Sequence, residues 1–410
     1  MNNKKIAGIV CEYNPFHTGH LYQIETLREM GYEKIVCVMS GNTVQRGEVA
    51  VVDKYSRATA AVKCGADLVL ELPYPYSSSG AEFFAAAAVK ILSEAGVGSV
   101  CFGSECNDIE RLQRAAQICE SEVFAEEYKN AVSGEKGTAD AYFEAYEMAA
   151  KRLGYGMENA DFGSNDLLGI SYIRAIIRNK LDMIPITIKR EGSAYNDENT
   201  DNAEGHPSAL MIRKGLEDGV GDLQKMMPKA SFETLSENIS KGTAPCSMKN
   251  IERAVLAFLR LADPEGLTEM NIAEAGGGLA EKICKCAKTA KSYDELVELA
   301  SGKKYTRSRV RRAILAAMIG VTESDIRKAP AYSTVLSFND KGREILASLR
   351  KRETAELPFV TKPADAKTLG EAAERQFALS EKADALFTLS RPTPTENGEY
   401  IARSPVYVEA

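Results

Sequence analysis

A regular alternation of apolar runs with helical stretches over the first two hundred or so residues constrains the fold more than any other feature. The apolar runs are nearly continuous in Val, Ile, Leu and Cys, as is typical of parallel strands that are buried on both faces. We predict strands at 5–11, 34–40, 67–73, 98–103 and 184–190. We predict helices between them, several opened by an acid or Ser that can cap the first turn, at about 19–30, 53–64, 81–95, 108–120 and 166–180. This order predicts an α/β fold with a doubly wound parallel sheet.

The character of the sequence changes after about residue 230. Apolar positions then recur at helical spacing, as at 251–262 and 311–320, and strand signals are few. We therefore expect an α/β domain over 1–230 and a mainly helical C-terminal domain over 231–410. Two segments are predicted as loops, namely the polar, turn-rich residues 191–206 before a helix that starts at SALMIR, and the glycine run 276–278.

Composition excludes several classes of protein. A net charge of −7 argues against a surface coated with basic residues, although a local basic patch is compatible with it. The nine cysteines are scattered and lack a CxxC pair, so neither a disulfide framework nor a zinc site is expected. No apolar stretch approaches the roughly 20 residues that cross a membrane, and Glu12 interrupts the first apolar run too early for a signal peptide. These features predict a cytoplasmic protein that does not bind membranes.

The stretch EYNPFHTGH at 12–20 holds two of only three histidines. It follows the first predicted strand, where an α/β sheet keeps its binding site. Gly19 permits close backbone approach, and we expect a helix to begin near His20 with free amides that favour anions. With the donors of both His17 and His20, the site suits a nucleoside triphosphate under attack at its α-phosphate. The simpler alternative is that both histidines are polar loop and helix-start residues.

HTGH after a first strand resembles the HxGH signature of the nucleotidyltransferase superfamily, whose members bind ATP and pass AMP to an acceptor. The wider sequence resembles the bacterial tRNA(Met) cytidine acetate ligase family at residues 8–24, 39–58, 102–105, 165–175, 186–192 and 303–315. The resemblance implies ATP-dependent activation of acetate to acetyl-adenylate, and then acetyl transfer to N4 of the wobble cytidine of elongator tRNA(Met). It also implies that the C-terminal domain binds tRNA.

Carried over residue by residue, the resemblance implies that His17, His20 and Arg190 are catalytic. It implies nucleotide contacts at Val10, Asn14, His17, Gly19, His20, Gln23, Gly103, Asn165, Arg190, Ser208 and Arg213. Ser208 and Arg213 resemble a second superfamily motif that holds the β- and γ-phosphates, although Ala209 replaces its second serine. From the residues alone, Asn165 is equally explained as a helix N-cap, and Arg190 as a solvated strand end. His206, in the loop before Ser208, is expected to be solvated.

Five polar residues gather between the second strand and the second helix, and they could form a wall for acetate or for the cytidine: Asn42, Gln45, Arg46, Asp53 and Arg57. The simpler interpretation is a polar loop in which Asp53 caps the helix and Arg57 pairs with it at i, i+4. We expect that pair to form in either case.

A run of cations with no acid among them predicts an RNA contact: Lys303, Lys304, Arg307, Arg309, Arg311 and Arg312. A helix face of one sign repels itself unless an anion such as phosphate lies nearby, although a solvated face is the usual alternative. Tyr305 could stack on a base.

Two other functions remain open. One is an adenylyltransferase that passes AMP to a small phosphate or carboxylate acceptor, and the other is a nucleotide- or RNA-binding module without turnover. The expected partners are tRNA(Met), ATP and acetate, with no DNA, and the oligomeric state is open. Mg²⁺ could bridge the phosphates, although no acidic cluster with ligand spacing predicts a metal site.

Overall fold

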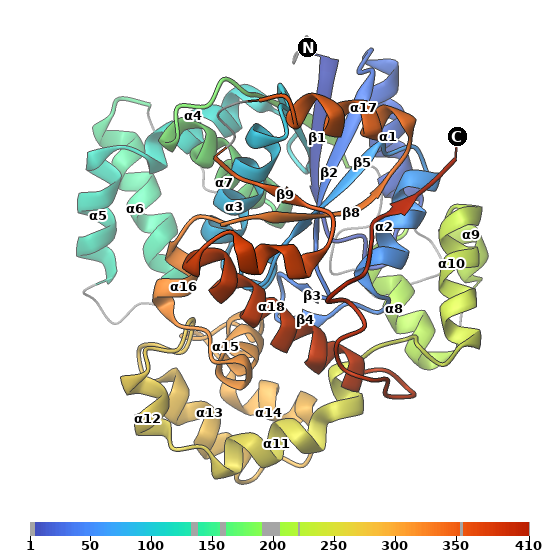
Figure 1. Ribbon diagram of the computed structural model, residues 1–410. Helices are drawn as coiled ribbons and strands as arrows, with labels where there is room; N and C mark the ends of the chain where they lie inside the picture. The colour runs from blue at the N-terminus through green and yellow to red at the C-terminus, as the bar shows by residue number, and fades with distance from the viewer. Residues whose placement is uncertain are drawn as a thin grey trace.

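The structure is a computed structural model that describes residues 5–132, 138–155, 161–190, 206–219, 222–352 and 356–409. These residues form an eight-stranded sheet, covered by helices on both faces, and a separate two-stranded hairpin (Figure 1). The predicted loop at 191–206 lies outside the described residues except for its last position. No helix in the described part of the chain has both the length and the apolar character that a membrane span needs.

The five predicted strands form the parallel centre of the sheet. They are β1 (Ile6–Cys11), β2 (Lys34–Ser40), β5 (Leu68–Leu72), β6 (Ser99–Ser104) and β7 (Ile184–Lys189), paired in the order β5-β2-β1-β6-β7. The chain first builds the sheet on one side of β1 and then crosses to the other side with β6. Such a change of direction creates a crevice outside the carboxyl ends of the strands, which here are β1 and β6.

The predicted crossover helices also form, and they divide between the two faces of the sheet. One face carries α1 (Thr18–Glu29) and α2 (Lys54–Lys63), whose buried side chains pack on alternate strand residues such as Ile9 and Cys37. The other face carries α3 (Ala81–Glu94), α4 (Ile109–Cys119) and α7 (Ser164–Arg178). The doubly wound α/β architecture is confirmed. The sequence did not reveal a pair of packed helices between α4 and α7, namely α5 (Glu122–Val132) and α6 (Thr138–Arg152).

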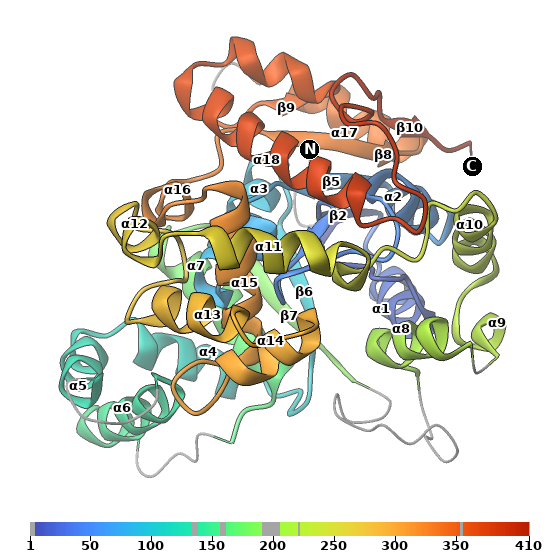
Figure 2. The same ribbon diagram turned by 90° about the horizontal axis from the view of Figure 1, so that it is seen from below.

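The region after residue 230 is mainly helical, as predicted, but it does not stay apart from the sheet. The strand β8 (Ser333–Phe338) pairs antiparallel with β5, while β9 (Phe359–Val360) and β10 (Val406–Tyr407) pair with β8. These strands lie beside α17 (Asp340–Leu349) and α18 (Glu371–Leu389) in Figure 2. The expectation of a separate helical region is therefore too simple, because its last part extends the same sheet.

The remaining helices are α8 (Ala209–Asp218), α9 (Leu223–Met226), α10 (Lys229–Ser240), α11 (Glu252–Leu261), α12 (Pro264–Glu269), α13 (Leu279–Ala287), α14 (Tyr293–Ala300), α15 (Arg307–Ile319) and α16 (Glu323–Arg327). Of these, α8 and α9 precede residue 230, and α11 to α15 lie below the sheet in Figure 1. Residues 276–278 form the predicted loop between α12 and α13. Apolar side chains of α11 and α13–α15 belong to the same core as α1 and α2, so this group packs directly on the α/β part.

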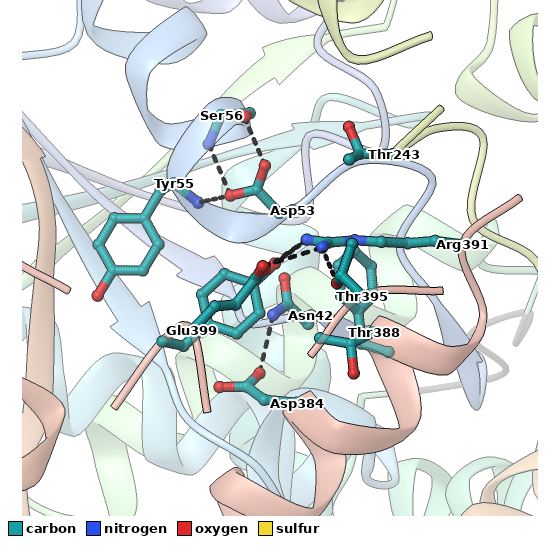
Figure 3. Close-up of polar contacts among 12 residues, drawn as sticks. Asn42, Asp53, Tyr55, Ser56, Thr243, Asp384, Thr388, Arg391, Thr395 and Glu399 are labelled. Atoms are coloured by element: carbon teal, nitrogen blue, oxygen red, sulfur yellow. Dashed lines mark hydrogen bonds and ion pairs between the residues drawn. The ribbon is translucent and has the colours of Figure 1, made fainter. Parts of the chain in front are cut away.

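A buried ion cluster fastens α18 to the sheet. Lys54 Nζ lies 2.8 Å from Glu71 Oε1 and 2.9 Å from Asp384 Oδ2, and only 2% of the Lys54 side chain is exposed. Burial disfavours the charged form of Lys54, but the two carboxylates outweigh burial and raise its pKa above the usual value. Figure 3 shows Asn42 Nδ2, which donates to Asp384 Oδ1 over 2.8 Å.

A second polar contact holds the chain that follows α18, and Figure 3 shows it beside the first. Arg391 donates to both carboxylate oxygens of Glu399, at 3.0 and 2.5 Å, and to Tyr400 Oη at 2.5 Å. A two-pronged contact of this kind fixes the direction of both side chains. The C-terminal segment is thus tied down next to the loop that carries Asn42.

We predict that Lys54→Met lowers the free energy of unfolding by about 3–5 kcal/mol, because it leaves two buried carboxylates without their cation. Lys63→Met is the matched control, since Lys63 is exposed on the same helix. Denaturant unfolding of both variants at neutral pH measures the difference. Equal stability of the two variants would show that the cluster does not hold α18.

Candidate active site

A cavity of about 370 Å³ lies at the predicted crevice. It is bounded by the end of β1, the start of α1, the ends of β6 and β7, and the starts of α7 and α8. Every residue for which the sequence implied a nucleotide contact lines it: Val10, Asn14, His17, Gly19, His20, Gln23, Gly103, Asn165, Arg190, Ser208 and Arg213. Residues that are up to about two hundred positions apart in the chain are thus brought to one hollow.

The two histidines of HTGH are locked by reciprocal hydrogen bonds at the start of α1. His17 is the N-cap, and its Nδ1 accepts from the backbone N–H of Gly19 at 3.1 Å. The Nδ1 of His20 accepts from the backbone N–H of His17 at 3.2 Å. The rings stack with centroids 3.7 Å apart and planes 29° apart. The alternative of plain loop and helix-start residues does not account for this mutual arrangement.

These contacts fix the protonation of both rings. A nitrogen that accepts a hydrogen bond carries no proton, so the proton of each neutral ring lies on Nε2. Burial lowers the pKa of His20 to about 3, with Arg190 contributing. Burial, followed by the neighbouring His20 and Arg190, also holds the pKa of His17 well below its usual value. At neutral pH the pair therefore offers two uncharged Nε2–H donors.

This geometry corrects the expectation that free helix amides face the ligand. The amide of Gly19 is taken by His17, and the amide of His20 donates to the His17 carbonyl at 2.9 Å. The imidazole of His17 instead stands between the helix terminus and the cavity. A Cβ on Gly19 would lie 3.0 Å from His17 Cε1 and 3.2 Å from His206 Cβ, so a glycine there gives both rings room.

The β6 and β7 side of the cavity carries the cation. Arg190 directly follows β7, and its Nη1 donates to Asn165 Oδ1 at 3.3 Å. A Cβ on Gly103 would lie 3.2 Å from Arg190 Cγ, so the glycine lets the guanidinium arm cross the end of β6. Asn165 is not an N-cap, because Gly163 occupies that position in α7. Its amide nitrogen donates to Glu105 at 2.5 Å, which orients the Asn165 side chain.

The start of α8 closes the cavity from the opposite side. Ser208 caps α8 by accepting from the N–H of Met211 at 3.2 Å. Arg213 donates to the backbone carbonyl of Asn14 at 2.9 Å and thereby joins α8 to the first loop. His206 also lines the cavity, with Nδ1 3.1 Å from Thr18 Oγ1. The expectation that His206 is merely solvated is wrong, and its place beside the Ser208 motif was the available signal.

Some residues of the polar segment between β2 and α2 line the cavity, and others hold the surrounding structure together. Gln45 and Arg46 line the cavity from the hairpin of β3 (Thr43–Val44) and β4 (Glu48–Val49). Asn42 does not line it, because its side chain is used by Asp384 and by the N–H of Lys54. Two of the five residues of the predicted wall, Gln45 and Arg46, therefore line the cavity, while their contact with acetate or the cytidine stays a prediction.

Arg57 is a scaffold residue rather than part of that wall. Asp53 caps α2 as predicted, accepting from the N–H groups of Tyr55 and Ser56. The predicted pair of Arg57 with Asp53 is not among the ion pairs of the described residues. The Arg57 guanidinium is instead 2% exposed and donates to backbone carbonyls after β1, at the end of β2 and before α2: those of Glu12, Ser40, Gly41 and Val52. The guanidinium of Arg57 donates to these carbonyls, and the Asp53 carboxylate already accepts from the helix amides.

The basic run at 303–312 is neutralised in part by acids from distant segments. The ion pairs are Arg307–Glu298, Arg311–Glu48 at 2.8 Å and Arg312–Glu274 at 2.9 Å. The sequence could not show these acids, so the argument from uncompensated charge is weakened for Arg307, Arg311 and Arg312. Lys303, Lys304 and Arg307 remain exposed.

Tyr305 is not placed to stack on a base. Only 5% of the residue is exposed, and its hydroxyl donates to the carbonyl of Gly277. Its ring is flanked by the cations of Lys282, Lys304 and Arg309, whose charged groups lie 5.2–5.5 Å from the ring centre. The Tyr305 ring therefore packs against the basic side chains and is not free to stack on a base.

The described residues contain no group of three or more His, Cys, Asp or Glu side chains arranged to hold a metal ion. Among the described residues that line the cavity, Glu12 is the single acid. All nine cysteines lie in the described residues as free thiols.

Comparisons with known proteins agree with this geometry. The sequence model of the HIGH Nucleotidyl Transferase family matches residues 4–400. The tRNA(Met) cytidine acetate ligase of Acetivibrio thermocellus is 36% identical over 95% of this chain and 96% of its own, and that of Clostridium perfringens is 33% identical over 98% and 99%.

Two crystal structures of Thermotoga maritima TmcAL have the same fold. The apo form has a TM-score of 0.92 at 31% identity, and the form bound with alpha-thio ATP has 0.89 at 30%; each comparison covers 99% of this chain and all of the other. With the HTGH cavity intact and relatives that match end to end, the chain belongs to the HIGH nucleotidyl transferases and, among them, to the tRNA(Met) cytidine acetate ligase family.

Proposed function

We propose that this protein uses ATP to activate acetate as acetyl-adenylate and transfers the acetyl group to N4 of the wobble cytidine of elongator tRNA(Met). The observation that carries the proposal is the pair of neutral Nε2–H donors of His17 and His20 in a cavity large enough for a nucleotide. The names of the relatives and the ATP analogue bound by Thermotoga maritima TmcAL support it.

In the first step, an acetate oxygen attacks the α-phosphorus of ATP, the bond to the bridging oxygen breaks, and pyrophosphate leaves. Negative charge builds on the phosphate oxygens, which uncharged Nε2–H groups and the Arg190 guanidinium stabilise. Because His17 and His20 are held by the backbone, they need no reorganisation as the charge develops. Gly103 and Asn165 would hold the nucleoside, while Ser208 and Arg213 would hold the leaving phosphates.

In the second step, the cytidine N4 attacks the acetyl carbonyl, AMP departs, and N4 loses a proton. The base must leave its stack to reach the cavity. We propose that the exposed cations Lys303, Lys304 and Arg307 bind the RNA backbone, and that residues 231–410 supply most of the tRNA surface next to a catalytic unit over 1–230. Such a substrate places the protein in the cytoplasm.

Mg²⁺ would enter as the counter-ion of the triphosphate. The described residues offer no dedicated ligand set for it, and Glu12 alone is not enough for a hard cation that prefers several oxygens. The chain itself therefore neutralises phosphate charge with Arg190 and Arg213, and the two uncharged imidazoles add hydrogen bonds.

The main competing function is an adenylyltransferase that hands AMP to a small phosphate or carboxylate acceptor. Incubating the purified protein with ATP, radiolabelled acetate and tRNA separates the two functions. Acetate-dependent pyrophosphate exchange and label on tRNA(Met) support the ligase. Exchange that needs another acceptor, with no label on RNA, would support the alternative.

We predict that His17→Asn and His20→Asn lower acetate-dependent ATP–pyrophosphate exchange by about 10²–10³, the usual cost of losing one transition-state donor. Asparagine keeps an acceptor near the position of Nδ1 but has no atom at Nε2. The matched variants His17→Gln and His20→Gln keep a donor near Nε2 and should retain more activity while losing helix stability. Exchange rates with circular dichroism on all four proteins measure both effects, and Asn variants with normal exchange would remove the imidazoles from the mechanism.

We predict that changing Lys303, Lys304 and Arg307 together to Ala weakens tRNA binding and lowers the slope of log affinity against log salt by up to about 3, because fewer counter-ions are released. Pyrophosphate exchange should persist. The control changes three exposed cations in and after α17, Lys341, Arg343 and Arg350, which lie away from the cavity. Filter binding across a salt series compares the two triple variants, and identical slopes would leave the basic run as a solvated face.

A further inference from the structure

The cavity has two flanks beside the HTGH segment. The proposed nucleotide contacts Gly103, Asn165 and Arg190 lie on the β6 and β7 side, and no proposed nucleotide contact comes from the hairpin after β2. Gly103 and Arg190 end β6 and β7, whereas Gln45 and Arg46 come from the hairpin after β2. The sheet order is β2-β1-β6-β7, so at about 4.8 Å per strand β2 lies about 10 Å from β6 and about 14 Å from β7. This inference rests on the proposed function. The β2 flank is then left for acetate or for the acceptor nucleotide, and not for the adenosine.

The hairpin tip is seated on the backbone of α15. Gly47 has φ +79°, and a Cβ there would lie 2.4 Å from the backbone nitrogen of Arg312 and 2.6 Å from the carbonyl carbon of Arg311. Glu48 forms the 2.8 Å ion pair with Arg311, although Glu48 itself does not line the cavity. A side chain at position 47 would therefore clash with the α15 backbone, so glycine is what lets the hairpin tip lie against the helix.

Further hydrogen bonds hold Gln45 from two sides. Its carbonyl accepts from Arg312 Nη1 at 3.4 Å, and its N–H donates to Glu12 Oε1 at 2.9 Å. Glu12 directly follows β1 and lines the cavity. The tip is thus fixed between the helix with the basic run and the strand that carries HTGH.

α15 therefore faces two ways. Its N-terminal end presents the exposed cation of Arg307, next to Lys303 and Lys304, while its middle holds the hairpin at the cavity. A base turned into the cavity brings its own backbone phosphates to the rim. A guanidinium such as that of Arg46 matches phosphate geometry, and an amide such as that of Gln45 can pair with a base edge.

We propose that Gln45 and Arg46 bind the acceptor nucleotide of the RNA, and that Gly47, Glu48, Arg311 and Arg312 are positioning residues that fix this tip on α15. The surface that binds RNA and the half of the cavity that performs transfer then form one rigid unit. Arg311 and Arg312 serve the transfer step through the hairpin, whereas the exposed cations of the run serve RNA affinity.

The test separates adenylation, RNA binding and transfer in three variants of the full chain. Glu48→Gln removes the ion pair to Arg311, Gly47→Ala pushes the tip away from α15, and Arg46→Gln removes the guanidinium. Gly31→Ala is the control for Gly47→Ala, because Gly31 also has positive φ, at +87°, but has no atom within 4 Å of the added Cβ. Each protein is assayed for acetate-dependent pyrophosphate exchange, tRNA affinity and single-turnover acetyl transfer.

We expect Gly47→Ala and Arg46→Gln to lower the transfer rate about 10²-fold, at least tenfold more than they lower exchange, since small misplacements of a reacting group cost this much. Glu48→Gln should show the same selective loss on a smaller scale, with tRNA affinity within about twofold of the parent. Gly31→Ala should change none of the three.

Equal losses in exchange and transfer would overturn the proposal, because the hairpin would then serve ATP binding or the fold. Unchanged transfer in all three variants would overturn it as well. If Gly47→Ala fails to fold by circular dichroism, Glu48→Gln and Arg46→Gln decide the question. Failure of the proposed function is distinct, since the unaltered protein would then show no acetate-dependent exchange.

Discussion

The hydrogen bonds between the histidine rings and the backbone at the start of α1 are the interaction on which the site depends. They turn a helix terminus, which would otherwise present bare amides, into two oriented imidazoles whose Nδ1 atoms are occupied. The His20 ring packs beside Tyr13 and Phe16, and burial keeps both histidine rings uncharged. A neutral ring donates one well-directed hydrogen bond without a counter-charge, which suits the phosphate oxygens that we propose to lie against Arg190 and Arg213.

Around this pair, the loops at the carboxyl edge of the sheet are joined by buried polar groups. Arg57 gathers the carbonyls that follow β1 and β2, and Asn14 accepts from the N–H of Val51 at 2.8 Å. Arg213 brings α8 to the same loop. A buried polar group that loses its hydrogen-bond partner destabilises the folded state, so these contacts favour a single arrangement of the loops around the cavity. The hairpin that we assign to the acceptor nucleotide is part of this network through Glu12.

Much of this could be predicted from the sequence, since strand composition and helix periodicity are local signals. The parallel strands lie within one residue of their predicted bounds, and all implied nucleotide residues meet at one cavity. The predictions that failed concerned contacts between segments that are far apart in the sequence. β8 is a six-residue strand between helices, and no local sequence signal indicates that it pairs with β5. Arg57 and Arg312 were misjudged because their partners, backbone carbonyls and Glu274, come from other segments.

Side-chain ¹⁵N NMR of the three histidines, assigned with single His→Gln variants, measures the protonation on which the account rests. In the ligand-free protein between pH 8 and 5, we predict that His17 and His20 stay neutral with the proton on Nε2, because burial lowers the pKa of His20 to about 3 and holds the pKa of His17 well below its usual value. Either ring titrating near pH 6.5, or carrying its proton on Nδ1, would contradict the account of how this site stabilises phosphate charge.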